Sequence, residues 1–298
     1  MSLYRKITVA TASIASAPLL KQLAADRRLA QVILPQTHAI LEESVRQNAP
    51  GVPITYAPRP QELGISADAD LLLVMGYPQK IDTPLNLTAF NIHFGPLPEN
   101  RGPDPVFWTI REGKPIAYVA IHELSNHLDA GKVLKEKGFD ILPGESYGML
   151  MNRLSMLSVP TILEVLEGKV TPRDQNETKA VYNPVPSEDD LAVKWNVMNA
   201  QEIIQLVNAC NPKYGGARAY ILDHPLHILE VSIADVDLPP DQSPPIPGMI
   251  VHASPEQGIF VTCHAQSYIR LNMISMPEGF FSGQRLAGMG TKAGTVLT

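Results

Sequence analysis

Short apolar runs alternate with helical patterns along the first half of the chain, and this alternation constrains the fold more than any other feature. The runs have the length of buried strands and span residues 6–10, 29–34, 52–56, 69–75 and 89–92. A helical pattern led by Pro18 and another over 39–46 separate the first three runs. We therefore predict an α/β fold with a Rossmann-like, mostly parallel sheet. In such sheets ligands bind beyond the carboxyl ends of the strands.

The second half of the chain has a different pattern. Leucines and methionines recur at helical spacing from 145 to 166, where Pro160 should kink or split the helix. Residues 168–188 are polar and aperiodic, so we interpret them as a linker region. Alternating apolar residues follow the proline-rich stretch 239–247 and predict a small open β-barrel. The predicted organisation is a large N-terminal domain, a connecting helical segment and a C-terminal OB-like β domain, over 1–188, 189–238 and 239–298.

Composition narrows the class of protein. The 298 residues are 45% hydrophobic, which fits a soluble globular protein, and their net charge of −6 weakens, without excluding, a large nucleic-acid footprint. We expect no membrane contact, because no run reaches the roughly 18 apolar residues of a spanning helix. The apolar run that follows the N-terminal Met-Ser-Leu-Tyr-Arg-Lys is too short for a signal peptide. Two cysteines, Cys210 and Cys263, make no disulfide framework, so we expect a cytoplasmic protein.

Three polar side chains, two of them at the end of the fifth predicted strand, are suited to catalysis. Asn91 and His93 close this strand, and Asp129 follows 36 residues after the histidine. An amide can donate a hydrogen bond to an oxyanion, and an imidazole can move a proton near neutral pH. A carboxylate can orient the imidazole and set its pKa. If the fold brings the three together, they can catalyse acyl transfer without a metal or a covalent intermediate.

The residues around these three extend the pattern. At fixed distances from them stand Leu97-Pro98, Arg101-Gly102, Trp108 to Gly113 and Asp129 to Gly131. This pattern resembles the folate-dependent formyltransferase family, which includes glycinamide ribonucleotide formyltransferase, the amino-sugar N-formyltransferases and methionyl-tRNA formyltransferase. The two-domain layout is most similar to methionyl-tRNA formyltransferase. Residues 206–217 look like the segment that joins that enzyme's domains, and 247–250 look like the start of its C-terminal barrel.

The resemblance implies 10-formyltetrahydrofolate as the donor, a primary amine as the acceptor, and no metal. Asn91 and His93 would stabilise the tetrahedral oxyanion, and His93 would carry protons while Asp129 tunes it or holds a relaying water. The resemblance also implies folate contacts in three loops, made by Gly76, Tyr77, Gly95, Pro96, Leu97, Pro98, Ser125, Asn126, His127 and Leu128. Contacts with the acceptor are expected from Arg101 and Trp195, although packing in the core is the alternative interpretation of Trp195.

The sequence leaves the acceptor open. Bacterial methionyl-tRNA formyltransferases usually carry a basic loop after the second strand, whereas this chain has a short acidic segment over 35–43. Gly95 and Pro96 also replace the first two residues of the family's Ser-Leu-Leu-Pro loop. The acceptor is therefore either charged initiator tRNA or a small or carrier-bound amine, such as an amino sugar, an amino acid or an aminoacyl thioester. An alternative of another class is an inactive, folate-binding regulatory protein.

Four other histidines are weaker candidates for a functional role. His224 and His227 are three residues apart and could ligate a metal, but no nearby cysteine or carboxylate pair completes a site. His122 and His127 flank the turn that contains Asp129, and we assign them structural or supporting roles.

Overall fold

The computed structural model describes residues 3–59, 62–81, 87–237 and 243–298. The chain divides into two compact units. Unit 1 consists of Met1–Val106, Pro115–Ile141 and Leu150–Val185, and unit 2 consists of Phe107–Lys114, Leu142–Met149 and Pro186–Thr298. The predicted domain boundaries at 188 and 238 stay predictions. Part of the predicted proline-rich linker, 239–242, lies outside the described residues.

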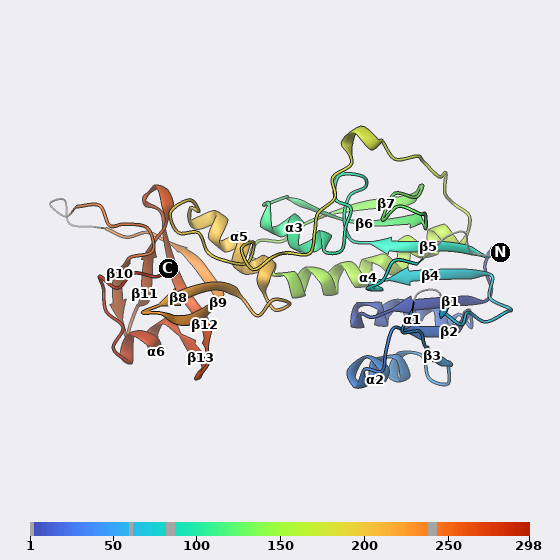
Figure 1. Ribbon diagram of the computed structural model, residues 1–298, viewed down its shortest axis with the longest axis horizontal. Coiled ribbons are helices and arrows are strands. Elements are labelled where there is room, and N and C mark those ends of the chain that lie inside the picture. The colour runs from blue at the N-terminus through green and yellow to red at the C-terminus, as the bar shows by residue number, and fades with distance from the viewer. Residues whose placement is uncertain (1–2, 60–61, 82–86, 238–242) are drawn as a thin grey trace. The chain divides into compact units, whose positions relative to one another are not determined.

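Unit 1 is built on one seven-stranded sheet with the order β3-β2-β1-β4-β5-β6-β7 (Figure 1). Its strands are β1 (Ile7–Thr11), β2 (Leu29–Leu34), β3 (Ile54–Tyr56), β4 (Leu71–Met75), β5 (Thr88–His93), β6 (Ile116–Glu123) and β7 (Val133–Asp140). Neighbours among β1 to β5 pair in parallel, whereas β6 is antiparallel to both β5 and β7. The prediction of a mostly parallel α/β sheet is confirmed.

The central strands show why this sheet forms. The sequences ITVAT of β1 and LLLVM of β4 are buried at every position. They therefore lack the polar alternation of a half-exposed strand, as is typical of a parallel sheet covered on both faces. The strand order reverses between β1 and β4, and such a switch point opens a crevice beyond the carboxyl ends of the strands. Strand β5, which holds Asn91 and His93, is the next neighbour of β4.

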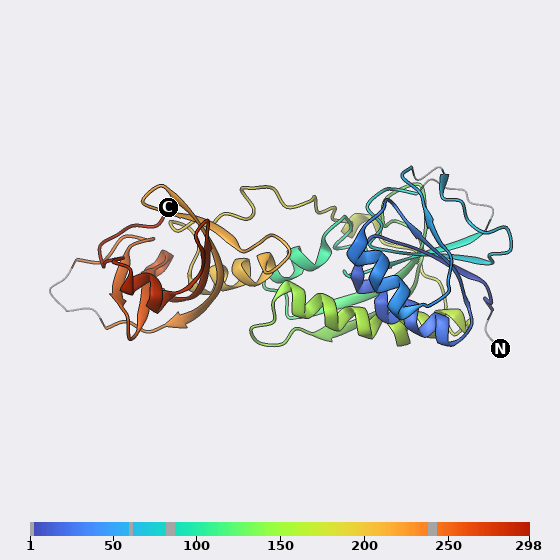
Figure 2. The same ribbon diagram turned by 90° about the horizontal axis from the view of Figure 1, so that it is seen from below.

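The described residues up to 166 form four α-helices: α1 (Ala17–Ala25), α2 (Ala39–Asn48), α3 (Pro105–Arg111) and α4 (Tyr147–Leu166). A 3-10 turn, η1 (Ile14–Ser16), precedes α1. Pro18 occupies the first turn of α1, where its missing N–H costs nothing. Helix α1 packs beside α2 (Figure 2). Pro160 lies inside α4, which continues through it as one helix, so the predicted split does not occur.

Helix α4 is also the one helix among the described residues that is long and apolar enough to cross a membrane. Its mean hydropathy is 1.2 over the best window, and 44% of that window is buried inside the protein. A single helix of this kind is weak evidence for a membrane, because the core helix of a soluble protein passes the same test. The expected lack of membrane contact stays a prediction.

Unit 2 contains an antiparallel sheet with the order β10-β11-β12-β9-β8, and β13 also pairs with β12. Its elements are α5 (Ala200–Cys210), β8 (Ala217–Ile221), β9 (His224–Ala234), β10 (Ile250–Ser254), β11 (Gly258–Thr262), the 3-10 turn η4 (His264–Gln266), β12 (Tyr268–Met276), β13 (Gly279–Ser282) and α6 (Gly283–Gly288). Helix α6 packs against β10 to β13 (Figure 2). The OB-like classification of this sheet stays a prediction.

The connecting segment predicted over 189–238 is only partly helical. Helix α5 lies there, with a capping box between Asn199 and Glu202 at its start. However, β8 and β9 follow within the same segment, and β9 pairs along its length with β12 of the C-terminal sheet. The hairpin that joins β8 to β9 turns at Leu222 and Asp223, both with positive φ. Because such turns normally carry Asn or Gly, the sequence contains little sign of this hairpin.

Candidate active site

The three side chains predicted to share chemistry, which we call the trio, meet at the carboxyl end of β5. Asn91 and His93 are two residues apart on this strand, so they lie on the same face. Asp129 reaches them from the turn between β6 and β7. Its Oδ1 lies 3.3 Å from Asn91 Nδ2, and its Oδ2 lies 3.7 Å from His93 Nδ1. Both His93 and Asp129 are buried, so the trio is largely shielded from water.

A backbone carbonyl fixes which nitrogen of His93 carries the proton. His93 Nε2 lies 2.7 Å from the Asn100 oxygen, and because a carbonyl only accepts, Nε2–H must be the donor. In the neutral imidazole Nδ1 is then unprotonated. This nitrogen faces Asp129, so it is the atom at which His93 can take up a proton.

His122 belongs to the same site. It lies directly opposite Asn91 in the pairing of β5 with β6, and its side chain is buried. Its Nδ1–H donates to the Glu123 carbonyl at 2.8 Å, so Nε2 can accept from Asn91 Nδ2 at 3.1 Å. This contact directs the NH₂ group of Asn91, not its oxygen, toward Asp129. Cross-strand register reveals this neighbour, and register is not visible in the sequence.

Burial and charge set the protonation states of the trio. Burial lowers the pKa of His93, and the Asp129 carboxylate opposes this only in part. Burial on its own would raise the pKa of Asp129. It is outweighed by His93, by His122 and by the Gly102 amide, which donates to Oδ2 at 2.9 Å, so the pKa of Asp129 lies below its usual range. At neutral pH a neutral imidazole therefore stands beside a carboxylate and is ready to accept a proton.

Arg101 is the centre of a buried network. Its side chain is fully buried, and its guanidinium donates to the Gln175 amide oxygen at 2.8 and 3.0 Å. It also donates to the Glu177 carboxylate at 2.6 and 3.0 Å and to the Tyr182 hydroxyl at 2.7 Å. These contacts use all five N–H groups of an arginine. The predicted contact between Arg101 and the acceptor does not fit this position, because no donor is left for it.

The partners of Arg101 come from a segment that the sequence marks as a linker. This segment instead bonds to the loop after β5 and to the turn that carries Asp129, and it includes a 3-10 turn, η3 (Glu177–Lys179). Arg173 exchanges two backbone hydrogen bonds with Val133 at the start of β7, each 2.9 Å long. A polar, aperiodic stretch is typical of a loop, and its partners lie about 75 residues away in sequence, so no local signal marks it as part of the site.

Two glycines of the motif allow close packing inside the protein. A Cβ on Gly131 would lie 1.8 Å from the Glu123 oxygen, so the lack of a side chain at this position lets the turn approach the end of β6. A Cβ on Gly95 would lie 3.0 Å from both His93 Nε2 and the Asn100 oxygen, the two atoms of the hydrogen bond that sets the His93 tautomer. Gly95 therefore protects the orientation of His93.

The residues implied as folate contacts lie in three loops of unit 1. Gly76 and Tyr77 follow β4, residues 95–98 follow β5, and residues 125–128 precede Asp129 in the β6–β7 turn. Not every side chain there is available. Leu97 packs in a small core cluster with Ala120 and Val133, and the Tyr77 hydroxyl donates to the Ala57 carbonyl at 2.9 Å. The role of these loops in folate binding stays a prediction.

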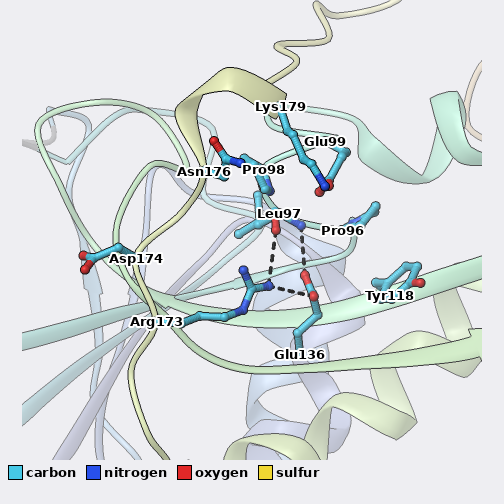
Figure 3. Close-up of a pocket in the computed structure, with 10 residues that line it drawn as sticks. All are labelled: Pro96, Leu97, Pro98, Glu99, Tyr118, Glu136, Arg173, Asp174, Asn176 and Lys179. Atoms are coloured by element: carbon cyan, nitrogen blue, oxygen red, sulfur yellow. Dashed lines mark hydrogen bonds and ion pairs between the residues drawn. The ribbon is translucent and has the colours of Figure 1, made fainter.

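A polar cavity of about 460 Å³ lies beside the Leu-Pro loop (Figure 3). Glu136 accepts from the Leu97 amide at 2.9 Å, and Arg173 bridges to Glu136 at 2.8 Å and to the Leu97 carbonyl at 3.3 Å. Pro96, Pro98 and Lys179 are among the other lining residues. No member of the trio lines this cavity, so it is a neighbour of the candidate site and not the site itself.

The remaining candidates lie in unit 2. Trp195 is buried there against Gly248, so its indole packs in the core and a contact with the acceptor has no support. His224 and His227 lie at an odd spacing on β9, which directs them to opposite faces. Within the described residues, no three His, Cys, Asp or Glu side chains gather as a metal site would require. Cys210 and Cys263 are free, and burial raises the pKa of each thiol to about 12.

Comparisons with known proteins point to one family. The family model described as formyl transferase matches residues 55–166, and the model of the formyl transferase C-terminal domain matches residues 187–280. Methionyl-tRNA formyltransferase of Lactobacillus gasseri is 27% identical over 207 residues, which cover 66% of this chain and 65% of that protein. The corresponding enzyme of Thermotoga maritima is 27% identical over 57% of this chain and 56% of its own length. The alignments thus span less than two thirds of these relatives.

Solved structures share the fold at lower identity. HypX from Aquifex aeolicus in complex with tetrahydrofolic acid has a TM-score of 0.65 at 19% identity, over 95% of this chain and 47% of HypX. An N-formyltransferase from Helicobacter canadensis, in complex with folinic acid and dTDP-3-aminofucose, has a TM-score of 0.62 at 14% identity, over 90% of this chain and 99% of that one. These likenesses show the fold. The two family models, which together cover most of the sequence, show that the chain belongs to the formyltransferase family.

Proposed function

We propose that this chain transfers a formyl group from 10-formyltetrahydrofolate to a primary amine at the trio. The observation that carries this proposal is the contact of a half-buried amide with a buried, neutral imidazole and a buried carboxylate at the carboxyl end of β5. Solved relatives in complex with tetrahydrofolic acid or folinic acid, or in the presence of 5-N-formyl-THF, support the choice of donor.

The geometry suggests an order of events. The amine nitrogen attacks the formyl carbon, and a tetrahedral oxyanion forms. The two N–H groups of Asn91 are engaged at rest, by His122 at 3.1 Å and by Asp129 at 3.3 Å. The longer of these contacts is the one that an oxyanion would replace. A donor that is already oriented needs little rearrangement when charge develops.

His93 carries the proton in this scheme. The attacking amine loses one proton, and the folate nitrogen that held the formyl group gains one. Nδ1 of His93 accepts the first proton, since Nε2–H is tied to Asn100. Asp129, 3.7 Å away, stabilises the resulting imidazolium. The same proton then passes to the folate nitrogen as the C–N bond breaks, which restores the neutral imidazole.

For the acceptor, charge favours a small or carrier-bound amine over tRNA. Residues 186–298 contain six Lys and Arg against eleven Asp and Glu, a net charge of −5. Two of these cations are already engaged, because Lys194 contacts Asp189 at 2.5 Å and Arg218 pairs with Glu188. The segment over 35–43 is acidic as well. A protein that binds a tRNA stem needs clustered Lys and Arg to contact the phosphates of the RNA.

The experiment that tests this function is an acceptor panel. Purified protein and 10-formyltetrahydrofolate are mixed with charged initiator methionyl-tRNA, with nucleotide-linked amino sugars, and with free or thioester-bound amino acids. We expect formylation of a small or carrier-bound amine. Salt-sensitive formylation of the tRNA would instead support the tRNA assignment. Folate binding with no formylated product in any arm would support the regulatory alternative.

We also propose a cytoplasmic location. Both cysteines are buried and free, which fits a reducing compartment. Fractionation of the native host, with the protein followed by antibody, tests this placement.

A further inference from the structure

Residues 171–183, which we call the strap, connect the two catalytic loops of unit 1. At one end, Arg173 and Val133 exchange backbone hydrogen bonds of 2.9 Å next to the Asp129 turn. At the other end, Val181 donates to the Pro98 carbonyl at 3.0 Å and accepts from the Arg101 amide at 2.9 Å. The strap is therefore bound both to the loop after β5 and to the turn that carries Asp129.

Gln175, in the middle of the strap, has every hydrogen-bonding position filled. Its Nε2 donates to the carbonyls of Asp129 at 2.8 Å and of Gly131 at 2.7 Å. Its Oε1 accepts from Arg101 Nε at 3.0 Å and from Nη2 at 2.8 Å. A side-chain amide offers two donors and two acceptor lone pairs, and all four are used here. One side of the amide thus holds the Asp129 turn, and the other holds the buried guanidinium.

The turn needs such support because its backbone is unfavourable. Asp129 has a φ of 52°, in the left-handed region that a residue with a Cβ rarely adopts. A hydrogen bond to its own carbonyl and another two residues later hold this conformation from outside the turn. Arg101 in turn is anchored by Glu177 and Tyr182, so Gln175 is itself fixed.

We infer that Gln175 is a positioning residue that keeps the Asp129 carboxylate directed at Asn91 and His93. This inference rests on the proposed function for its kinetic consequence, but not for its structural one. Gln175 acts through the backbone of the Asp129 turn. Its two hydrogen bonds there go to backbone carbonyls and not to the side chains of the trio.

The sharpest test is Gln175→Glu with Asn176→Asp as its matched control. The carboxylate introduced by Gln175→Glu keeps an oxygen for Arg101 but presents its other oxygen to two carbonyls, so the turn loses both donors and meets repulsion. Asn176→Asp adds the same charge one residue away, where the side-chain oxygen only accepts from Thr178. We expect kcat for formyl transfer to fall about 100-fold in Gln175→Glu, the effect of a displacement of about 1 Å. The KM of Gln175→Glu for the folate should stay near the wild-type value. The control variant should keep both kcat and KM near wild type.

A second variant gives a readout that does not depend on turnover. Gln175→Leu removes all four hydrogen bonds without adding charge, and its fold is checked by circular dichroism. We expect NMR titration of His93 to give a lower pKa than in the wild type, because the carboxylate that favours the imidazolium moves away. A merely stabilising amide would change the melting temperature alone.

The outcomes separate the two claims. Wild-type protein that forms no product with any amine would overturn the proposed function, and the His93 titration would then decide the role of Gln175. Gln175→Glu with the kcat of its control, or Gln175→Leu with an unchanged His93 titration, would overturn the positioning role.

Discussion

The two units of the chain differ in what they bury. Unit 1 buries His93, Arg101, His122 and Asp129 within about 40 residues of sequence, and each is held by named partners. Unit 2 buries mainly apolar side chains, with its two thiols free. Since a buried charge costs free energy unless it is paired, a protein that concentrates such groups in one place has a use for them there. The comparison supports the proposal that the formyl-transfer chemistry belongs to unit 1.

The largest expected effect is on turnover in unit 1. Asn91→Ala removes a donor for the oxyanion, and Asp129→Ala removes the charge that stabilises the His93 imidazolium. Each should lower kcat about 100- to 1000-fold, as the loss of one oxyanion-hole donor does. Steady-state rates with 10-formyltetrahydrofolate and the accepted amine measure this, with thermal melting to confirm the fold. Rates within a few-fold of wild type would contradict the assignment of the chemistry to the trio in unit 1.

The next effect is on stability in unit 2. Ile228 on β9 is fully buried, and Ile228→Ala leaves a cavity in the core of the second sheet. We expect the free energy of unfolding to fall by about 2–5 kcal/mol. Below the melting transition kcat should be unchanged, because no group of the trio is touched. Denaturant melts paired with rate measurements check both halves. A large loss of kcat in a folded variant would place part of the chemistry in unit 2.

A smaller effect appears in the pH dependence. The pKa of His93 is lowered by burial, so kcat/KM should hold as the pH falls past about 6.5 and decline only at lower pH, when Nδ1 becomes protonated. The free energy of unfolding should also decrease as the pH falls. The unfolded chain takes up this proton first, so the folded state is destabilised as the pH drops below about 6.5. Profiles of kcat/KM over about pH 5 to 8 show where the acidic decline begins. A decline that begins above pH 6.5 would contradict the burial argument.

The smallest expected effect is that of salt. A small or carrier-bound amine on an acidic protein should show little change in kcat/KM between about 50 and 200 mM salt, whereas 6–10 phosphate contacts would cost about 10³- to 10⁵-fold. Initial rates across this range measure the slope. A steep decline of kcat/KM with rising salt would show that the acceptor is a polyanion. The acceptor would then have to bind a basic surface of the protein.

Sequence reasoning finds what depends on local pattern. The first five strands of unit 1 follow from apolar runs, and Asn91, His93 and Asp129 follow from a spaced motif. Sequence reasoning misses what depends on partners far away in the chain. It also misses a local element whose turn lacks the usual residues, because Leu222 and Asp223 form the β8–β9 turn without glycine.

The candidate site shows the same division. Arg101 looks available to a substrate in the motif, yet the strap takes all its donors. His122 joins Asn91 through strand register, and Gln175 reaches Asp129 from 46 residues away. A glutamine in a polar stretch has no local signature, because its role is set by the carbonyls that it meets after folding.

One measurement tests the central claim most directly. The rate of formyl transfer and the affinity for 10-formyltetrahydrofolate are compared in wild type and in Asp129→Asn, which keeps the shape of the side chain and removes its charge. The account predicts a loss of kcat of about 100-fold or more with nearly unchanged folate affinity, since the charge acts on His93 during the reaction. Wild-type kcat in a folded Asp129→Asn protein would contradict it.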